Sequence, residues 1–122
     1  MIKLIVAGCR DYNNKTDFEE VLSRKTVDLL VSFPDQQIEI VSGGATGADA
    51  MAKGFAKLYQ YEYKEFPADW KQHGKAAGPI RNQQMAEYGT HLLAFWDGKS
   101  KGTRDMINKA RIRRLKVDIV YI

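Results

Sequence analysis

Glycine, hydroxyl and carboxylate residues gather in two short segments of this sequence, 42–49 and 97–103. Each segment follows an apolar run and precedes a helical pattern. Glycines in such a place let the backbone turn sharply and come close to a ligand. The free N–H groups at the start of the following helix favour an anion such as phosphate. The two segments therefore predict phosphate binding; the plainer alternative is that the glycines only make tight turns.

The residues of these segments that we expect to contact the ligand carry N–H, hydroxyl or carboxylate groups: Ser42, Gly43, Gly44, Thr46, Gly47, Asp49, Asp97, Gly98, Ser100, Gly102 and Thr103. The second segment lacks the spacing of a P-loop, because no lysine directly precedes Thr103, and the first lacks the Gly-x-Gly-x-x-Gly dinucleotide fingerprint. The spacing argues against ATP hydrolysis and NAD-dependent oxidoreduction. For Asp49 and Asp97, the alternative role is to cap a helix or a turn.

Two other loops supply basic groups. Gly8 and Arg10 follow the first apolar run, and Arg81 and Asn82 end a long polar segment. Arginine suits bidentate contact with phosphate or carboxylate, so we expect these residues to bind the ligand. Surface salt bridges are the alternative role of both arginines.

Asp69 and Trp70 lie in the same long segment. Asp69 could act as an acid or base, with Arg81 as its catalytic partner, and Trp70 could stack on a base or plug the site as an apolar lid. Cys9 is expected to pack as a small residue at a strand end. The two histidines lack the spacing of metal ligands, so no metal site is predicted.

Five apolar runs predict strands, and four intervening segments have a helical period. The strands are expected over residues 2–7, 38–41, 61–66, 91–96 and 116–122. Thr16 and Glu19 suggest a capping box for the first helix, and residues 48–59 carry the clearest apolar stripe. The third helix is expected to start at Pro79, and the last to cover 103–114.

Strands alternating with helices predict an α/β fold: a single Rossmann-like three-layer sandwich with a five-stranded, mainly parallel sheet, spanning residues 1–122 as one domain. The length of 122 residues fits one core. In such sheets ligands bind beyond the carboxyl ends of the strands, where the candidate residues are expected.

The composition limits the classes of partner. With 44% hydrophobic and 28% charged residues the chain is typical of a globular protein, and no apolar run reaches the roughly 18 residues of a membrane span. A single cysteine excludes an internal disulfide and suits the reducing cytoplasm. The net charge of +4 favours anionic partners. It does not make a nucleic-acid groove, so nucleic acid is disfavoured as a partner.

Five segments of the sequence resemble the YspA-like branch of the SLOG superfamily, which also includes the LOG phosphoribohydrolases and the DNA-processing protein DprA. The matching segments are 7–11, 42–49, 66–70, 74–82 and 94–103. The resemblance implies a Rossmann-like fold that binds nucleotides or nucleotide-derived molecules. It also implies a sensor or processor of such ligands, as proposed in conflicts between bacteria and phages, and hence the cytoplasm of a bacterium or of a phage-infected cell. Cys9 departs from the usual serine.

The resemblance to the LOG enzymes can be followed residue by residue. Arg81 falls on the position of their catalytic arginine. The position of their catalytic glutamate falls on Met106, with Asp105 one residue earlier. One residue turns a helix by about 100°, so Asp105 is expected to point elsewhere. This departure argues against LOG-type hydrolysis.

Three functions therefore stay open. The first is a domain that binds or senses a nucleotide or nucleotide-like phosphate ligand, with no certain cofactor beyond that ligand. The second is a hydrolase that cleaves an N-glycosidic or phosphoester bond of a nucleotide derivative. The third is a DprA-like binder of single-stranded nucleic acid. The sequence leaves homo-oligomerisation undecided.

Overall fold

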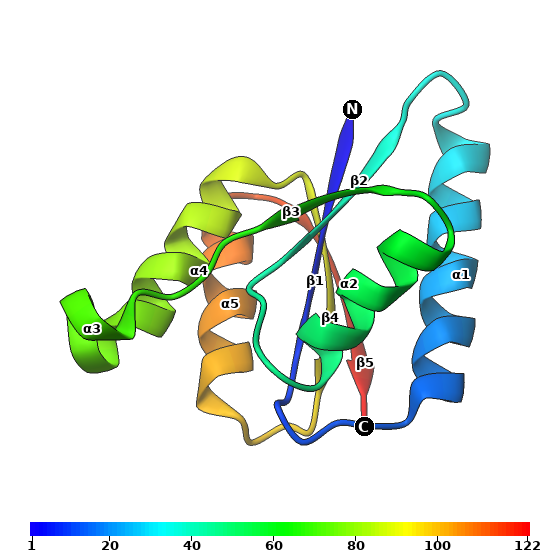
Figure 1. The fold of residues 1–122 in the computed structure, drawn as a ribbon. Helices are drawn as coiled ribbons and strands as arrows, with labels where there is room; N and C mark the ends of the chain where they lie inside the picture. Colours follow the sequence, from blue (N-terminus) through cyan, green and yellow to red (C-terminus); the bar gives the residue numbers. More distant parts are fainter.

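A computed structural model describes residues 1–122 as one five-stranded sheet with helices on both faces (Figure 1). The strands are β1 (Ile2–Gly8), β2 (Ile38–Ser42), β3 (Glu62–Glu65), β4 (His91–Trp96) and β5 (Lys116–Tyr121). The helices are α1 (Lys15–Ser32), α2 (Ala48–Leu58), the single turn α3 (Trp70–His73), the 3₁₀ turn η1 (Gly74–Ala76), α4 (Ala77–Tyr88) and α5 (Lys101–Ile112).

All neighbouring strands are parallel, in the order β3-β2-β1-β4-β5. The chain builds outward from β1 to β3, then crosses the sheet and builds outward again from β4 to β5. The strand order therefore reverses between β1 and β4, which is the point where open α/β sheets bind ligands. The arrangement confirms the predicted Rossmann-like α/β fold.

Alternation along β1 divides the core into two layers. Leu4 and Val6 pack with α1 and α2, whereas Ile5 and Ala7 pack with α4 and α5. Because successive side chains of a strand point to opposite faces, a strand covered on both faces must be apolar throughout. This requirement explains the continuous apolar run of residues 4–7 within β1.

The helix starts differ from the sequence prediction. Asn14, not Thr16, caps α1: its Oδ1 accepts the Asp17 N–H at 3.1 Å, so the predicted capping box with Glu19 is wrong. Helix α4 begins at Ala77, with Pro79 inside its first turn, where the missing N–H would have no acceptor within the helix. Helix α5 begins at Lys101, two residues early. None of the helices is both long and apolar enough to cross a membrane.

Candidate functional site

A cavity of about 500 Å³ opens at the carboxyl edge of the sheet. Its walls come from the β1–α1 loop, the β4–α5 loop, α4 and the start of α5. These elements flank the place where the strand order reverses between β1 and β4. The cavity therefore lies where the topology predicts a ligand.

The first turn of α5 forms one wall of this cavity. Ser100, Lys101, Gly102 and Thr103 all line it. The N-cap residue Ser100 makes no side-chain capping bond; its hydroxyl lies 3.3 Å from that of Thr103. The first-turn N–H groups of a helix have no acceptor within the helix, and the dipole adds partial positive charge. This wall can hold an anion.

Asp97 shapes the loop that leads into α5. Its Oδ1 accepts the N–H of Ser100 at 2.7 Å and that of Lys99 at 2.8 Å. These two backbone bonds, Ser100 first, hold the pKa of Asp97 below its usual range. Gly98, which lies between Asp97 and Lys99, has a φ of +80°, which glycine adopts without strain. Asp97 lines the cavity as well, but one of its oxygens is committed to the turn.

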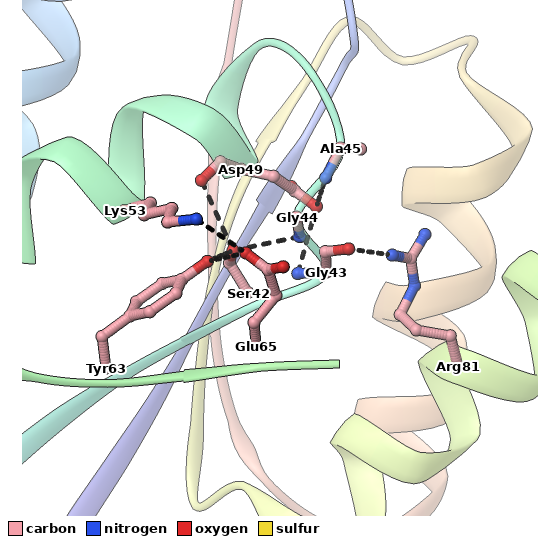
Figure 2. A network of polar contacts seen from close by, with 9 residues as sticks. All are labelled: Ser42, Gly43, Gly44, Ala45, Asp49, Lys53, Tyr63, Glu65 and Arg81. Atoms are coloured by element: carbon pink, nitrogen blue, oxygen red, sulfur yellow. Dashed lines mark hydrogen bonds and ion pairs between the residues drawn. The ribbon is translucent and has the colours of Figure 1, made fainter. Parts of the chain in front are cut away.

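The glycine loop after β2 is filled by the chain itself. Asp49 Oδ2 accepts the N–H of Gly43 at 3.2 Å and that of Ala45 at 3.4 Å (Figure 2). The Gly44 N–H donates to Ser42 Oγ at 3.3 Å. Burial raises the pKa of Asp49, and the charge of Arg81 opposes that rise. Two of the donors expected to bind phosphate are therefore used within the protein: the Gly43 N–H by the Asp49 carboxylate and the Gly44 N–H by Ser42.

A polar network beneath this loop fixes its shape (Figure 2). The Tyr63 hydroxyl lies 2.7 Å from Ser42 Oγ and donates to Glu65 Oε1 at 2.8 Å. Lys53 Nζ lies 3.7 Å from the same Glu65 oxygen. The Glu65 carboxyl packs so closely that a Cβ on Gly44 would lie 2.6 Å from its Cδ. Ser42 therefore supports the loop from below. It lines neither the cavity of about 500 Å³ nor a smaller cavity that lies beside it.

Arg81 reaches from α4 to the glycine loop (Figure 2). Its Nη1 donates to the Gly43 carbonyl at 2.7 Å, and its Nε donates to Asn82 Oδ1 at 3.2 Å. Burial lowers the pKa of Arg81, while the Asp49 charge opposes that shift. Its Nη2 makes no hydrogen bond within the protein, and the residue lines the cavity. Arg81 can therefore offer the two N–H donors of its charged Nη2 to a ligand.

Trp70 and Arg10 stand at the opening of the cavity. Half of the Trp70 surface is exposed (49%), and the Arg10 guanidinium carbon lies 5.5 Å from the centroid of its ring. Both residues also line a smaller cavity of about 150 Å³ next to the first. An exposed aromatic face at a cavity mouth suits stacking with a flat ligand group.

The main cavity brings together most of the predicted site residues. Those that line it are Gly8, Arg10, Asp49, Trp70, Arg81, Asn82, Asp97, Ser100, Gly102 and Thr103. Gly43 and Gly44 line only the smaller cavity. Ser42, Thr46, Gly47, Gly98 and Asp69 line neither.

Besides Ser42, two of the residues outside the cavities have structural contacts. Asp69 Oδ1 accepts the Gln72 N–H at 3.1 Å and so caps the single turn α3. Thr46 Oγ1 donates to the Arg10 carbonyl at 3.1 Å. These contacts correspond to the capping and turn roles that polar residues often have at helix starts.

Asp105 corrects the sequence prediction. It was expected to point away from the site, yet both Asp105 and Met106 line the cavity. Adjacent positions in the second turn of α5 straddle the line facing the cavity, so a 100° rotation leaves both at its wall. Asp105 Oδ2 accepts from Asn82 Nδ2 at 3.0 Å. Sequence reasoning also missed Gly78 and Met85, which carry no chemical signal.

Residues 2–73 match the YspA, cpYpsA-related SLOG family. The Gene 61 protein of Mycobacterium phage D29 is 34% identical over 117 residues, which are 91% of this chain and 90% of that protein. A crystal structure described as a predicted subunit of tRNA methyltransferase from Methanocaldococcus jannaschii aligns with a TM-score of 0.49 and 11% identity. The alignment covers 100% of this chain and 69% of that one.

Proposed function

The chain belongs to the YspA, cpYpsA-related SLOG family, and from this premise we propose that it binds a nucleotide or nucleotide-derived phosphate ligand in the cavity at the carboxyl edge of the sheet. The observation that carries the proposal is the start of α5, which has no side-chain cap and lines that cavity together with Arg81, whose Nη2 has no hydrogen bond within the protein. The phosphate lies on the first-turn N–H groups of Gly102 and Thr103.

The remaining groups of the cavity suit the rest of a nucleotide. Trp70 offers a ring face for the base, and Arg10 lies against that ring. Four carboxylates line the cavity together with three basic side chains. A pocket with this balance does not favour a highly charged polyphosphate. It suits a ligand with one phosphate and several hydroxyl or amino donors.

A second candidate function is hydrolysis of an N-glycosidic or phosphoester bond of such a ligand. It is supported by one observation: the Asp105 carboxylate lies at the cavity wall, on the same side as Arg81 and Asn82. A carboxylate within reach of a bound ligand can act as a general base or acid. Asp69 lines neither cavity, so Asp105 takes its place in this proposal.

The first experiment is mass spectrometry of small molecules released from the purified protein, followed by calorimetric titration with the four ribonucleoside 5′-monophosphates. We expect a phosphorylated nucleoside derivative in the released fraction or saturable binding of at least one monophosphate. The variant Arg81→Ala should lose that binding. Arg111→Ala removes the same charge from an exposed position outside the cavity and should keep it.

Two results would count against the proposal. An empty protein that binds none of the monophosphates, nor any other nucleotide in a thermal-shift screen, would remove it. Equal binding by the Arg81→Ala and Arg111→Ala variants would place the ligand elsewhere. Hydrolysis is tested in the same samples: release of free base or phosphate by the native chain, lost in Asp105→Asn, supports the second candidate.

A further inference from the structure

The side chain of Asn82 is hydrogen-bonded to three groups of the protein. Its Oδ1 accepts from Arg81 Nε at 3.2 Å. Its Nδ2 donates to Asp105 Oδ2 at 3.0 Å and to the Gly102 carbonyl at 3.3 Å. A primary amide has two N–H donors, and both are used here. Asn82 lines the cavity but has no free donor with which to hold a ligand.

The donor and acceptor properties of the neighbouring groups determine the orientation of the Asn82 amide. Arginine Nε can only donate, so the atom that faces it must be the carbonyl oxygen of Asn82. The Asp105 carboxylate and the Gly102 carbonyl can only accept, so the atom that faces them must be the nitrogen. An aspartate at this position would set its charge against the Asp105 carboxylate. Among side chains of this shape, only asparagine provides the acceptor and the donors together.

The Asn82 contact determines which edge of Arg81 stays free. The guanidinium is a planar group with five N–H donors. Nε is taken by Asn82, and Nη1 by the Gly43 carbonyl at 2.7 Å. Two contacts at different nitrogens fix both the position and the rotation of the plane. Nη2 is the one guanidinium nitrogen with no hydrogen bond within the protein, and Arg81 lines the cavity.

Asp105 is itself held in place. Lys109 Nζ lies 2.9 Å from Asp105 Oδ1 and 2.8 Å from Oδ2, and it donates to the Pro79 carbonyl of α4 at 3.1 Å. The chain of contacts runs from Lys109 through Asp105 and Asn82 to Arg81. It ties the start of α4 to the first turns of α5, the two elements that carry the free arginine edge and the anion-binding N–H groups.

We infer that Asn82 is a positioning residue, not a ligand-binding one: held by Asp105, it orients the Arg81 guanidinium so that Nη2 faces the cavity. The inference deepens the proposed function, since it rests on Arg81 as the charged contact to the ligand. The ordering of Arg81 by Asn82 can be tested without a ligand, because the contact between them lies within the protein.

The test of the ordering uses the ligand-free protein. The Nε–H signal of Arg81 is identified in a nitrogen–proton NMR spectrum by its absence from the Arg81→Lys variant, and its exchange with solvent is measured. We expect slow exchange in the native chain and exchange faster by about tenfold or more in Asn82→Ala, because a buried bond to a charged donor is lost. Asp105→Ala should shift exchange in the same direction by less. Gln84→Ala, an exposed neighbour on α4, should leave it unchanged.

A pair of charge-matched variants separates positioning from simple loss of stability. Asn82→Asp should free Arg81 because two carboxylates then face each other across the 3.0 Å contact. In the double variant N82D/D105N, donor and acceptor change places, and slow exchange at Arg81 should return at least in part. A purely structural role would lower the unfolding temperature in the single variants without changing the Arg81 signal. That result would overturn the inference.

Titration with adenosine 5′-monophosphate then links the ordering to binding. If the native chain binds this probe, Asn82→Asp should weaken binding by about tenfold and the double variant should recover part of it. Unchanged affinity together with a disordered Arg81 would overturn the link to the ligand. If no nucleotide binds the native chain, the proposed function fails, while the NMR result still decides whether Asn82 orders Arg81.

Discussion

The carboxylate of Asp49 accepts the backbone N–H of Gly43 at 3.2 Å, so the first turn of α2 fills the glycine loop that precedes it. The same Oδ2 also accepts the Ala45 N–H at 3.4 Å. Convergence of two N–H groups on one oxygen is how such loops bind external anions. Here the anion is built in, and for this reason the anion site that we propose is the start of α5 instead.

The burial of Asp49 predicts an unusual dependence of stability on pH. Because burial raises the pKa of Asp49 above its ordinary 3.8, the folded state holds this proton more tightly than the unfolded state. The Asp49 contribution to stability therefore falls as pH rises from about 4 through the folded pKa. Asp49→Asn keeps an oxygen for both N–H groups and should lose this contribution to the pH dependence.

The measurement is the free energy of unfolding of the native chain and of Asp49→Asn between pH 4 and pH 7. The unfolding free energy of the variant should increase relative to that of the native chain as pH rises. If the unfolding free energy of the variant instead decreases relative to that of the native chain, the Arg81 charge outweighs burial. The pKa of Asp49 is then lowered, which contradicts this prediction.

Gly43→Ala tests the close approach of Arg81 to the glycine loop. The added Cβ would lie 2.0 Å from Arg81 Nη1 and 2.9 Å from Asp49 Oδ2, so both side chains must move. We expect a loss of about 1–3 kcal/mol of unfolding free energy, as for overpacked interiors. Gly54→Ala is the matched control in α2. Its Cβ meets nothing within 4 Å, and it should gain about 0.5–1 kcal/mol.

Urea unfolding of the two variants beside the native chain checks this pair. Equal stability changes in both would mean that the loop adapts to a side chain at position 43 without displacing the arginine.

The fold could be predicted from sequence because its signals are local. The apolar run of β1 predicts a strand covered on both faces, and alternation with helical segments leaves a parallel sheet as the natural arrangement. The residues at which the helices begin were harder to predict from the sequence. Asn14 caps α1 one turn before the first strong apolar residue, and the Thr16–Glu19 pair imitates a capping box.

The site was predicted only as far as topology determines it. Loops that follow parallel strands meet at one edge, so the gathering of Arg10, Arg81 and Thr103 follows from the fold. Which donors stay open depends on contacts between residues that the sequence pattern does not pair. The bond from Gly43 to Asp49 and the bond from Asn82 to Asp105 decide this, and both require the three-dimensional arrangement.

Two glycines with positive φ separate backbone strain from steric clash. Gly98 has a φ of +80° and open space around it, so Gly98→Ala should cost about 1–2 kcal/mol from strain alone. Gly47 has a φ of +74°, and a Cβ there would lie 2.3 Å from the Cys9 carbonyl oxygen. Gly47→Ala should therefore cost more, about 2–5 kcal/mol.

Chemical denaturation of both variants gives the two values. A Gly47→Ala variant no less stable than Gly98→Ala would show that the β1–α1 and β2–α2 loops are not held together as closely as the structure has them.

His91 lies at the opposite edge of the sheet and predicts a loss of stability in mild acid. Its Nδ1 lies 2.8 Å from Thr90 Oγ1, whereas its buried Nε2 has no hydrogen-bond partner. Burial, followed by the charges of Lys25 and Lys116, lowers the pKa of His91 below 6.5, although Asp118 opposes the shift. The unfolded chain therefore binds this proton more readily than the folded one.

It follows that the stability contributed by neutral His91 is present above pH 6.5 and is lost as pH falls through the folded pKa. His91→Phe keeps a ring against Phe33, whose centroid lies 6.3 Å away, and removes the titration. Between pH 7.5 and pH 5 the unfolding temperature of the native chain should fall more than that of this variant. His73→Gln, which replaces the exposed second histidine, should behave like the native chain. If the unfolding temperature of His91→Phe falls as much as that of the native chain over this range, the acid sensitivity comes from the carboxylates and not from the buried imidazole.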